Sequence, residues 1–552
     1  MSVDSLESMI RKFVLANALE HNGVAQPKSV LGKILNEFPE LRAQSLQMLP
    51  DIEKVAREVN GLSQTEQQTM LSALGGYTAK PRTERVGLPE LEVGKKGFVV
   101  RFAPNPDGSL HLGNARPAIL CDEYAKKYNG KFILRFDDTD PKIKVPEAKY
   151  YKWIREDLKW LGVTVHKEYI ASKRLPIYYQ YAEDVIKKGG AYVCTCETEK
   201  WRKLRNATEA CPCRNRDVKT VLKQWKQMLA HKYKEGQAVL RIKTDIAAKN
   251  PAVRDWPAFR IVDQPKHPLQ KKKCVWPLYN FASAIDDYLL SVTHIFRAQE
   301  HATNETKQRY LYQYFCWSYP FVITLGRFSL SDMVLSKSMI REGIRKRKFA
   351  GWDDLHLGTI KTLRRRGFLP QTLRQIIVEI GPKPSDITIS MENLAAFNRK
   401  NIDAIANRYF FIPNPMKIKV KKLRLKTVEI PVHPDNKKKT RKFALSDTFF
   451  IDASDFDRYR HLEVRLKDLI NIKLDTVSEV VGNETKSIPK VQWLPVKHLT
   501  VRVYMPDKDI MGYGETALAK AKVGDIAQFE RFGFVKIEKV GKNNVVVVFA
   551  HP

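Results

Sequence analysis

The residues best suited to chemistry lie in a short turn between an apolar run and the start of a helical pattern. The stretch VVRFAPNPDGSLHLGNARPAIL, residues 99–120, places His111, Gly113 and Asn114 where a helix is expected to begin. Backbone N–H groups at a helix N-terminus have no partner within the helix, and with the helix dipole they favour an anion. An imidazole there can donate to a phosphate oxygen, and glycine permits close approach. The turn therefore predicts a phosphate site, although a lone histidine more often caps a helix or packs in a loop.

A second stretch, VLSKS at residues 334–338, supplies a positive charge. It places Lys337 between two serines in an expected loop, and no Gly-Lys-Ser/Thr phosphate loop accompanies either stretch. An ammonium group is a compact cation suited to phosphate oxygens. A single lysine in a basic chain is by default solvated. We therefore expect Lys337 to bind phosphate only if the two stretches lie close together in the fold.

The elements around these residues predict an α/β core. Residues 97–103, 112–130 and 131–141 follow the pattern of strand, helix and strand. Such a βαβ unit implies parallel strands with a right-handed crossover, and ligands bind open α/β sheets at the carboxyl ends of the strands. Similar patterning resumes near residue 274. We therefore expect a Rossmann-type parallel sheet with the turn at its carboxyl edge.

The flanking regions have other patterns. Ser63 followed by Glu66 predicts a capping box for a helix over 63–74, and a basic, Pro- and Gly-punctuated linker covers 75–97. Short alternating strands after residue 412 predict one or two β-barrels. The expected organisation is a helical domain at 1–80, the first half of the core at 97–190, an insertion with a cysteine cluster at 191–265, the second half of the core at 266–340, a helical domain at 341–412 and a β-barrel region at 413–552.

The charge of the chain points to a polyanionic partner. Lys and Arg number 95 against 61 Asp and Glu, a formal net charge of +34. This balance favours nucleic acid first and an anionic membrane surface second, with plain solubility as the alternative. Basic clusters follow the core at residues 341–349, 363–368, 417–426 and 436–443. Solvated lysines at sheet edges would also explain them.

Composition also bounds the compartment. No stretch approaches the roughly 18 apolar residues of a membrane-spanning helix, and the N-terminus lacks the order of a signal or transit peptide. Seven cysteines in 552 residues do not make a disulfide framework. We expect a cytoplasmic protein with no membrane partner, of a size that suits a monomer.

Four of the cysteines form two close pairs, Cys194 with Cys196 and Cys211 with Cys213. Four thiolates arranged in this way fit a tetrahedral structural zinc site. The Cys-x-Cys spacing is less familiar than Cys-x-x-Cys, so reduced cysteines without metal are the alternative.

Taken together, the two opening stretches resemble the His-Ile-Gly-His and Lys-Met-Ser-Lys-Ser signatures of class I aminoacyl-tRNA synthetases. The first departs at its last position, where Asn114 cannot carry the charge of a histidine, and the second reads Val-Leu-Ser-Lys-Ser. The stretches RFAPNPDGSLHLGNAR, LRFDDTDP, WPLYNFASAIDDYLLSVTHIFRAQEH and LRRRGF narrow the resemblance to the glutamyl/glutaminyl subfamily. The helical N-terminal extension and the β-rich C-terminus are similar to archaeal-type glutamyl-tRNA synthetases.

This resemblance implies that ATP, accompanied by Mg²⁺, activates L-glutamate to glutamyl-adenylate. The glutamyl group then passes to the terminal adenosine of tRNA(Glu). Whether tRNA(Gln) is a second acceptor depends on anticodon contacts. The implied roles are catalysis by His111, Asn114 and Lys337, and ATP binding by His111, Gly113, Asn114, Ser336 and Lys337. The insertion would lie against the acceptor end of the tRNA, 341–412 would contact its stem, and 413–552 would bind the anticodon.

The resemblance also implies which residues bind glutamate. Arg101 and Arg297 would supply two guanidiniums, Asp137 would face the ammonium, and Tyr279 would place a hydroxyl near the amino group. A buried carboxylate needs a cationic partner, so a substrate with two carboxylates needs two. Arg297 stands where the glutaminyl branch lacks an arginine. Its planar fork matches a side-chain carboxylate and would leave the amide NH₂ of glutamine unmatched.

Three alternatives stay open. A glutaminyl-tRNA synthetase would be distinguished by replacing Arg297 and comparing activation of glutamate and glutamine. A nucleotidyltransferase of small molecules shares the His-x-Gly-His type of site, but the long basic C-terminal region argues against it. A catalytically inactive tRNA-binding relative is disfavoured by the joint presence of His111, Lys337, Arg101 and Arg297.

Overall fold

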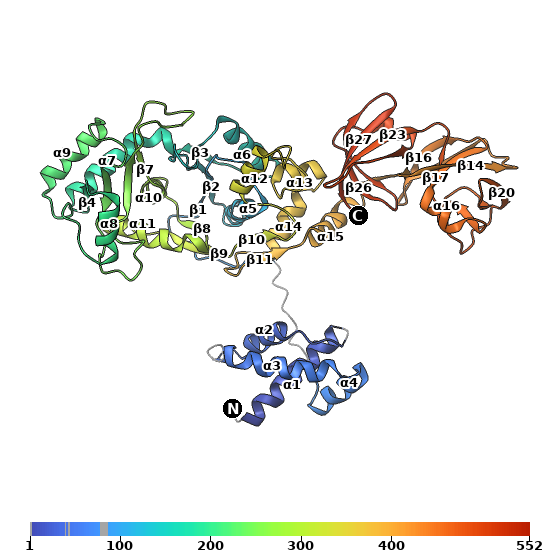
Figure 1. Ribbon diagram of the computed structural model, residues 1–552, viewed down its shortest axis with the longest axis horizontal. Coiled ribbons are helices and arrows are strands. Elements are labelled where there is room, and N and C mark those ends of the chain that lie inside the picture. Colours follow the sequence, from blue (N-terminus) through green and yellow to red (C-terminus); the bar gives the residue numbers. More distant parts are fainter. Residues whose placement is uncertain (1–2, 22, 39, 42–44, 78–86) are drawn as a thin grey trace. The chain divides into compact units, whose positions relative to one another are not determined.

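A computed structural model describes residues 3–21, 23–38, 40–41, 45–77 and 87–552 (Figure 1). The chain divides into two compact units, Met1–Val86 and Gly87–Pro552. Part of the linker expected at 75–97, residues 78–86, lies outside the described residues. Within the described ranges, no helix combines the length and the apolar character needed to cross a bilayer.

The described part of the first unit is helical, as its apolar spacing predicts. Its helices are α1 (Val3–Glu20), α2 (Pro27–Glu37), α3 (Ser45–Asn60) and α4 (Gln64–Ala73). They bury a common core that includes Phe13, Ile34 and Val55. The side chain of Ser63 accepts from the backbone N–H of Glu66 at 3.3 Å, and Glu66 Oε2 accepts from the N–H of Ser63 at 2.8 Å. The predicted capping box is confirmed.

The second unit contains a five-stranded sheet in the order β3-β2-β1-β8-β9. All of its neighbouring strands are parallel, with Val99 opposite Lys131 and Val100 opposite His294. The parallel, Rossmann-type core expected from the sequence is confirmed. Its strands are β1 (Val99–Phe102), β2 (Lys131–Phe136), β3 (Lys167–Ile170), β8 (His294–Ala298) and β9 (Phe321–Leu325).

Helices join the strands of this sheet. α5 (Leu112–Lys127) follows β1, α6 (Ala148–Trp160) follows β2, and α11 (Ala302–Tyr314) follows β8 (Figure 1). After α5 the chain must turn tightly into β2. A Cβ on Gly130 would lie 2.3 Å from the carbonyl oxygen of Phe98, so only glycine fits at this close approach.

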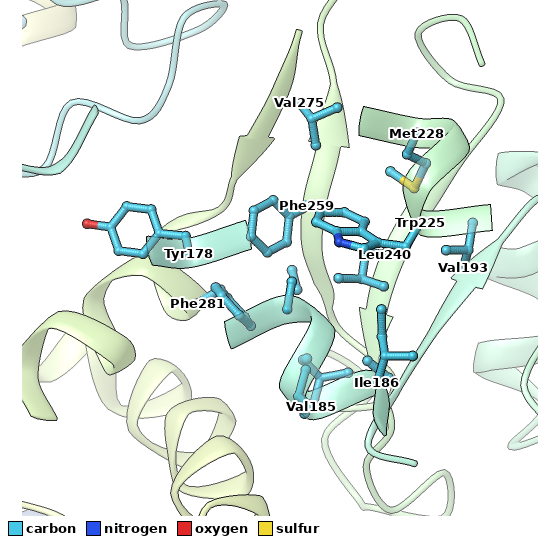
Figure 2. Close-up of a cluster of buried hydrophobic side chains, with 14 of the residues drawn as sticks. Tyr178, Val185, Ile186, Val193, Trp225, Met228, Leu240, Phe259, Val275 and Phe281 are labelled. Atoms are coloured by element: carbon cyan, nitrogen blue, oxygen red, sulfur yellow. The ribbon is translucent and has the colours of Figure 1, made fainter. Parts of the chain in front are cut away.

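An antiparallel sheet, in the order β4-β5-β6-β7, interrupts the parallel core. The aromatic side chains of Trp225, Phe259 and Phe281 pack into one hydrophobic cluster with Tyr178 (Figure 2). Because these residues come from both the insertion and the helices of the core, the two share a continuous interior. The elements are α7 (Leu175–Lys187), β4 (Ala191–Cys194), α8 (Thr198–Asn206), α9 (Val218–Leu229), β5 (Val239–Ile242), β6 (Pro257–Ile261), β7 (Val275–Pro277) and α10 (Tyr279–Leu289).

Helices predominate after the core. They are α12 (Lys337–Arg345), α13 (Ile360–Arg366), α14 (Pro370–Ile380) and α15 (Met391–Ile402), with a short parallel pair of β10 (Phe328–Leu330) and β11 (Ile387–Ile389). One local prediction was wrong: Lys337, expected in a loop, is the first residue of α12, and Ser336 is its N-cap. Gly343 in this helix lies against Phe349, where a Cβ would approach the ring to 2.3 Å. The helix begins four residues before the helical region expected at 341–412.

The C-terminal region forms two barrel-like sheets, as predicted. One has the order β12-β25-β26-β27-β23-β24-β13 and the other β21-β18-β19-β20-β14-β17-β22. Arg365 of α13 pairs with Glu538 of β26 and joins the first sheet to the helices. The strands are β12 (Asn407–Tyr409), β13 (Phe411–Ile412), β14 (Pro415–Lys421), β17 (Thr448–Asp452), β18 (Glu463–Leu466), β19 (Asn471–Lys473), β20 (Val477–Gly482), β21 (Lys490–Val491), β22 (Leu494–Pro495), β23 (Leu499–Tyr504), β24 (Ile510–Gly514), β25 (Ile526–Phe529), β26 (Gly533–Val540) and β27 (Asn544–His551), beside a hairpin of β15 (Thr427–His433) and β16 (Asn436–Ala444) and a helix α16 (Ala453–Tyr459).

Candidate active site

Two neighbouring cavities, of about 800 and 540 Å³, lie at the carboxyl ends of β1 and β8. These strands are neighbours at the point where the strand order reverses, which is the usual ligand site of an open α/β sheet. The structure brings all the predicted ATP- and glutamate-binding residues to these cavities. Asp137 and Lys337 line the larger one, Arg101, Gly113 and Arg297 line the smaller one, and His111, Asn114, Tyr279 and Ser336 line both.

His111 is the N-cap of α5. Its Nδ1 accepts the backbone N–H of Asn114 at 3.3 Å, and Asn114 Oδ1 accepts the N–H of His111 at 3.4 Å. Burial, with the nearby ammonium of Lys337, lowers the pKa of His111 to about 3. The imidazole is therefore neutral at pH 7, and because Nδ1 accepts, its hydrogen lies on Nε2. His111 can therefore cap the helix through Nδ1 and still donate a hydrogen bond to an anion through Nε2.

Gly113 leaves room for that imidazole. A Cβ at this position would lie 3.0 Å from the carbonyl oxygen of Phe328 and 3.1 Å from ring atoms of His111. Any side chain would have to displace the ring or the backbone. Glycine therefore keeps His111 at the cavity wall.

Lys337 faces the same cavity from the N-terminus of α12. Its Nζ donates to Asp107 Oδ1 at 2.8 Å and to the carbonyl oxygen of Asn105 at 3.2 Å. Burial lowers the pKa of the ammonium, while Asp107 opposes that shift. Lys144 and Arg341 also line the cavity. Three cations close to two helix N-termini form an environment suited to a triphosphate.

Arg101 extends from β1 and is held by a carboxylate. Its Nε lies 3.1 Å from Asp287 Oδ1 and its Nη2 lies 3.3 Å from Asp287 Oδ2. Arg135 Nη1 also donates to Asp287 Oδ1, at 2.7 Å. Burial opposes the charge of Arg101, but Asp287 more than offsets it and the pKa of Arg101 is raised. Its guanidinium is thus charged, fixed and paired.

Asp137 and Tyr279 complete the predicted set. Burial raises the pKa of Asp137, while Arg135 lowers it through a contact of 2.7 Å between Nε and Oδ1. Tyr279 is the first residue of α10, is 38% exposed and lines both cavities. An acid and a hydroxyl therefore line the larger cavity.

Arg297 extends from β8 and is only 6% exposed. Its Nη2 donates to Gln308 Oε1 at 2.9 Å and to the Tyr319 hydroxyl at 3.3 Å. Its Nε and Nη1 are buried and have no hydrogen-bond partner in the described part of the chain. Buried donors without an acceptor raise the free energy of the folded protein unless a ligand with acceptor oxygens binds there.

Known protein families match most of this chain. The family of class I tRNA synthetases (E and Q), catalytic domain, matches residues 98–404. The chain belongs to this family. Two anti-codon binding domain families of the same class I (E and Q) tRNA synthetases match residues 406–493 and 490–538. The protein is therefore a class I tRNA synthetase, an enzyme of the ligase class.

Similar proteins match along the whole chain. The glutamate–tRNA ligase of Thermococcus kodakarensis is 49% identical over 100% of both chains, and that of Pyrococcus abyssi is 49% identical over 99% of this chain and 100% of its own. The glutamate–tRNA ligase of Methanocaldococcus jannaschii is 41% identical over 99% and 100%. A solved glutamate tRNA ligase from Elizabethkingia meningosepticum is 22% identical, with a TM-score of 0.42, over 56% of this chain and 70% of that one. The resemblance to archaeal-type enzymes is confirmed.

Sequence reasoning missed the residues that hold the site of this synthetase together. Asp287 and Arg135 fix Arg101 and Asp137, Gln308 and Tyr319 hold Arg297, and Asp107 binds Lys337. Among these residues, only the aspartates could have been identified from the sequence. Asp286 and Asp287 stand together in the apolar stretch FASAIDDYLL, where buried carboxylates require cationic partners.

The four paired cysteines of the insertion lie together. Their sulfur atoms are all within 4.8 Å of one another, and Cys194–Cys211, Cys196–Cys211 and Cys196–Cys213 are 3.7, 3.8 and 3.7 Å apart. A tetrahedron with zinc–sulfur bonds of about 2.3 Å has edges of about 3.8 Å. A disulfide would need about 2.05 Å. The donor set and its spacing fit a structural zinc ion.

Proposed function

We propose that this enzyme is a glutamate–tRNA ligase that forms glutamyl-adenylate from ATP and L-glutamate and transfers the glutamyl group to the terminal adenosine of tRNA(Glu). The observation that carries the choice of amino acid is Arg297. It is a buried guanidinium that lines the same cavity as Arg101 and has no carboxylate oxygen within 4.0 Å among the described residues. The activity named for the relatives at 49% identity agrees with this choice.

In the first step, a carboxylate oxygen of glutamate attacks the α-phosphorus of ATP, and pyrophosphate leaves. The protein contributes position and charge stabilisation rather than covalent chemistry. His111 would donate from Nε2, Asn114 from Nδ2, and Lys337 would supply an ammonium, with Ser336 and Gly113 beside the phosphates. Mg²⁺ bound to ATP would share the phosphate charge.

Glutamate would span the two cavities, with its carboxylates in the smaller one and its ammonium toward the larger one, which Asp137 lines. Arg101 and Arg297 suit the two carboxylates, and Asp137 with the hydroxyl of Tyr279 suits the ammonium. A guanidinium offers only hydrogen-bond donors. The NH₂ group of glutamine, in place of a carboxylate oxygen, would set one donor against another without an acceptor between them. This mismatch disfavours glutamine and with it a glutaminyl-tRNA synthetase.

In the second step, the 2′-hydroxyl of the terminal adenosine attacks the acyl carbon of glutamyl-adenylate and loses its proton, the bond from that carbon to the phosphate oxygen breaks, and AMP leaves. We propose tRNA contacts along residues 191–265, 341–412 and 413–552, because a net charge of +34 suits phosphates spread along a long RNA. tRNA(Gln) as a second acceptor, the monomeric state, the cytoplasmic location and the six domain boundaries stay predictions.

A zinc ion bound by Cys194, Cys196, Cys211 and Cys213 would have a structural role. It would cross-link the end of β4 to the segment after α8 and so fix the shape of the insertion. With four thiolate ligands the ion has no open coordination position, so it would take no part in the reaction. Four reduced cysteines are the alternative.

Aminoacylation by the full-length protein tests the proposed function. ATP–pyrophosphate exchange and aminoacylation are measured with glutamate or glutamine, with and without tRNA(Glu) or tRNA(Gln). We expect glutamate-dependent exchange and glutamyl-tRNA(Glu). A higher kcat/KM for glutamine would identify a glutaminyl enzyme, and no exchange under any of these conditions would identify an inactive relative.

A further inference from the structure

The two guanidiniums of the smaller cavity are held in different ways. Arg101 is paired through two nitrogens with the carboxylate of Asp287. Among the described residues, Arg297 is held by two neutral oxygen atoms, Gln308 Oε1 and the Tyr319 hydroxyl. Arg101 shares the carboxylate of Asp287 with Arg135, whereas Arg297 has no carboxylate partner in the described part of the chain.

The geometry fixes the orientation of the Gln308 amide. The hydroxyl of Tyr319 donates to Gln308 Oε1 at 2.6 Å, and Arg297 Nη2 donates to the same oxygen at 2.9 Å. Two donors that converge on one atom identify it as the carbonyl oxygen rather than the NH₂ group. Gln308 is fully buried on α11. It therefore holds Arg297 in one position.

Tyr319 remains a neutral donor over the working range of pH. Burial raises its pKa to about 12, although Arg297 opposes this shift. A phenolate would have neutralised Arg297, but a phenol does not. The guanidinium is thus positioned through Nη2, while Nε and Nη1 keep their hydrogens for another acceptor.

We propose that Gln308 and Tyr319 are positioning residues that select glutamate over glutamine, because they fix Arg297 without neutralising it. The inference rests on the proposed function and names residues that would act through Arg297 rather than touch the substrate. A carboxylate at position 308 would occupy the guanidinium internally. The substrate carboxylate would then compete with a covalently tethered one, and the advantage of glutamate over glutamine would fall.

Gln308→Glu tests this directly, since it replaces the amide by a carboxylate of nearly the same shape. We expect the KM for glutamate to rise about 10- to 100-fold, the loss typical of a charged hydrogen-bonded pair. The ratio of kcat/KM for glutamate to that for glutamine should fall by a similar factor, while the KM for ATP stays unchanged. Gln313→Glu, the same change on the exposed side of α11, is the matched control and should match the wild type.

Tyr319→Phe is the second variant. It removes one holder but leaves Gln308 in contact with Arg297, so the KM for glutamate should rise only about 3- to 10-fold, with kcat little changed. Thermal unfolding of each variant shows whether it is folded. If Gln308→Glu does not fold, the KM of Tyr319→Phe for glutamate tests the inference in its place.

An unchanged glutamate KM and unchanged discrimination in folded Gln308→Glu would overturn the inference. A fall in kcat alone, equal for both amino acids, would overturn it as well, because it would indicate a general structural role. Failure of the proposed function looks different. In that case the wild-type enzyme itself would lack glutamate-dependent activity, before any variant is compared.

Discussion

The ammonium of Lys337 lies 2.8 Å from the carboxylate of Asp107. Lys337 begins α12 and Asp107 lies in the loop that leads into α5, so this ion pair joins the two helix N-termini that face the larger cavity. Arg341 Nη2 lies 3.4 Å from the other oxygen of Asp107. The carboxylate of Asp107 thus links two stretches that are 230 residues apart in the sequence, and the hydrogen bond from Lys337 to the carbonyl oxygen of Asn105 adds to this link.

Lys337→Ala is expected to slow adenylate formation about 10²- to 10³-fold, the usual loss when one group that stabilises developing charge is removed. The KM for glutamate should change little, because the carboxylates of glutamate would lie in the smaller cavity, which Lys337 does not line. Glutamate-dependent ATP–pyrophosphate exchange with tRNA present measures the rate. Lys152→Ala, an exposed change on α6 outside the proposed tRNA contacts, is the control. Equal rates in the two variants would mean that Lys337 does not act on the phosphates.

His111 should make the folded enzyme less stable as the pH falls. Its pKa is about 3 in the folded protein against an ordinary value of 6.5, so between these values the unfolded chain binds a proton that the folded chain does not. Stability is therefore lost as the pH falls below 6.5. At pH 5 the loss relative to pH 7 is about 2 kcal/mol.

His111→Asn isolates this contribution, because asparagine also caps helices but does not titrate. Urea unfolding, followed by tryptophan fluorescence at pH 7 and pH 5, gives the change in unfolding free energy for each protein. The wild type should lose about 2 kcal/mol more than His111→Asn between the two pH values. Identical losses would show that His111 binds a proton at pH 5 as readily in the folded enzyme as in the unfolded chain.

Local signals explain how much of this structure could be predicted. The capping box at Ser63 and the start of α5 at His111 depend on residues three or four positions apart, and both follow from residue type. The parallel sheet follows from the βαβ pattern. The partners of Arg101 and Arg135 could not be read in this way, because Asp287 lies 186 and 152 residues away from them.

The neutral holders of Arg297 illustrate the same limit. Gln308 lies 11 residues beyond Arg297 on the next helix, and Tyr319 lies 22 residues beyond it, before β9. Neither residue type is unusual in its local sequence. They become partners of Arg297 only through the fold, which brings α11 and the segment before β9 to its side chain. The resemblance therefore identified the guanidinium but not the residues that position it.

Cys211→Ser is expected to abolish zinc binding, since it removes one of four ligands from the cluster. Elemental analysis should find about one zinc ion per wild-type chain and almost none in the variant. The midpoint of thermal unfolding should fall by about 2 °C, as for a loss of about 2 kcal/mol in a chain of this length. Cys316→Ser, which changes an exposed cysteine outside the cluster, should keep both zinc and stability. A wild-type protein without zinc would favour four reduced cysteines.

Arg297→Met keeps an apolar stem of similar length but removes the guanidinium. Because Arg297 has no carboxylate partner among the described residues, its loss leaves no protein anion stranded, and the fold should survive. We expect kcat/KM for glutamate to fall about 100-fold or more, while glutamine, which gains little from the guanidinium, loses much less. Aminoacylation with each amino acid gives the two ratios, with Arg57→Met, an exposed change on α3 outside the proposed tRNA contacts, as the control. An equal loss for both amino acids would mean that Arg297 supports the cavity without choosing the substrate.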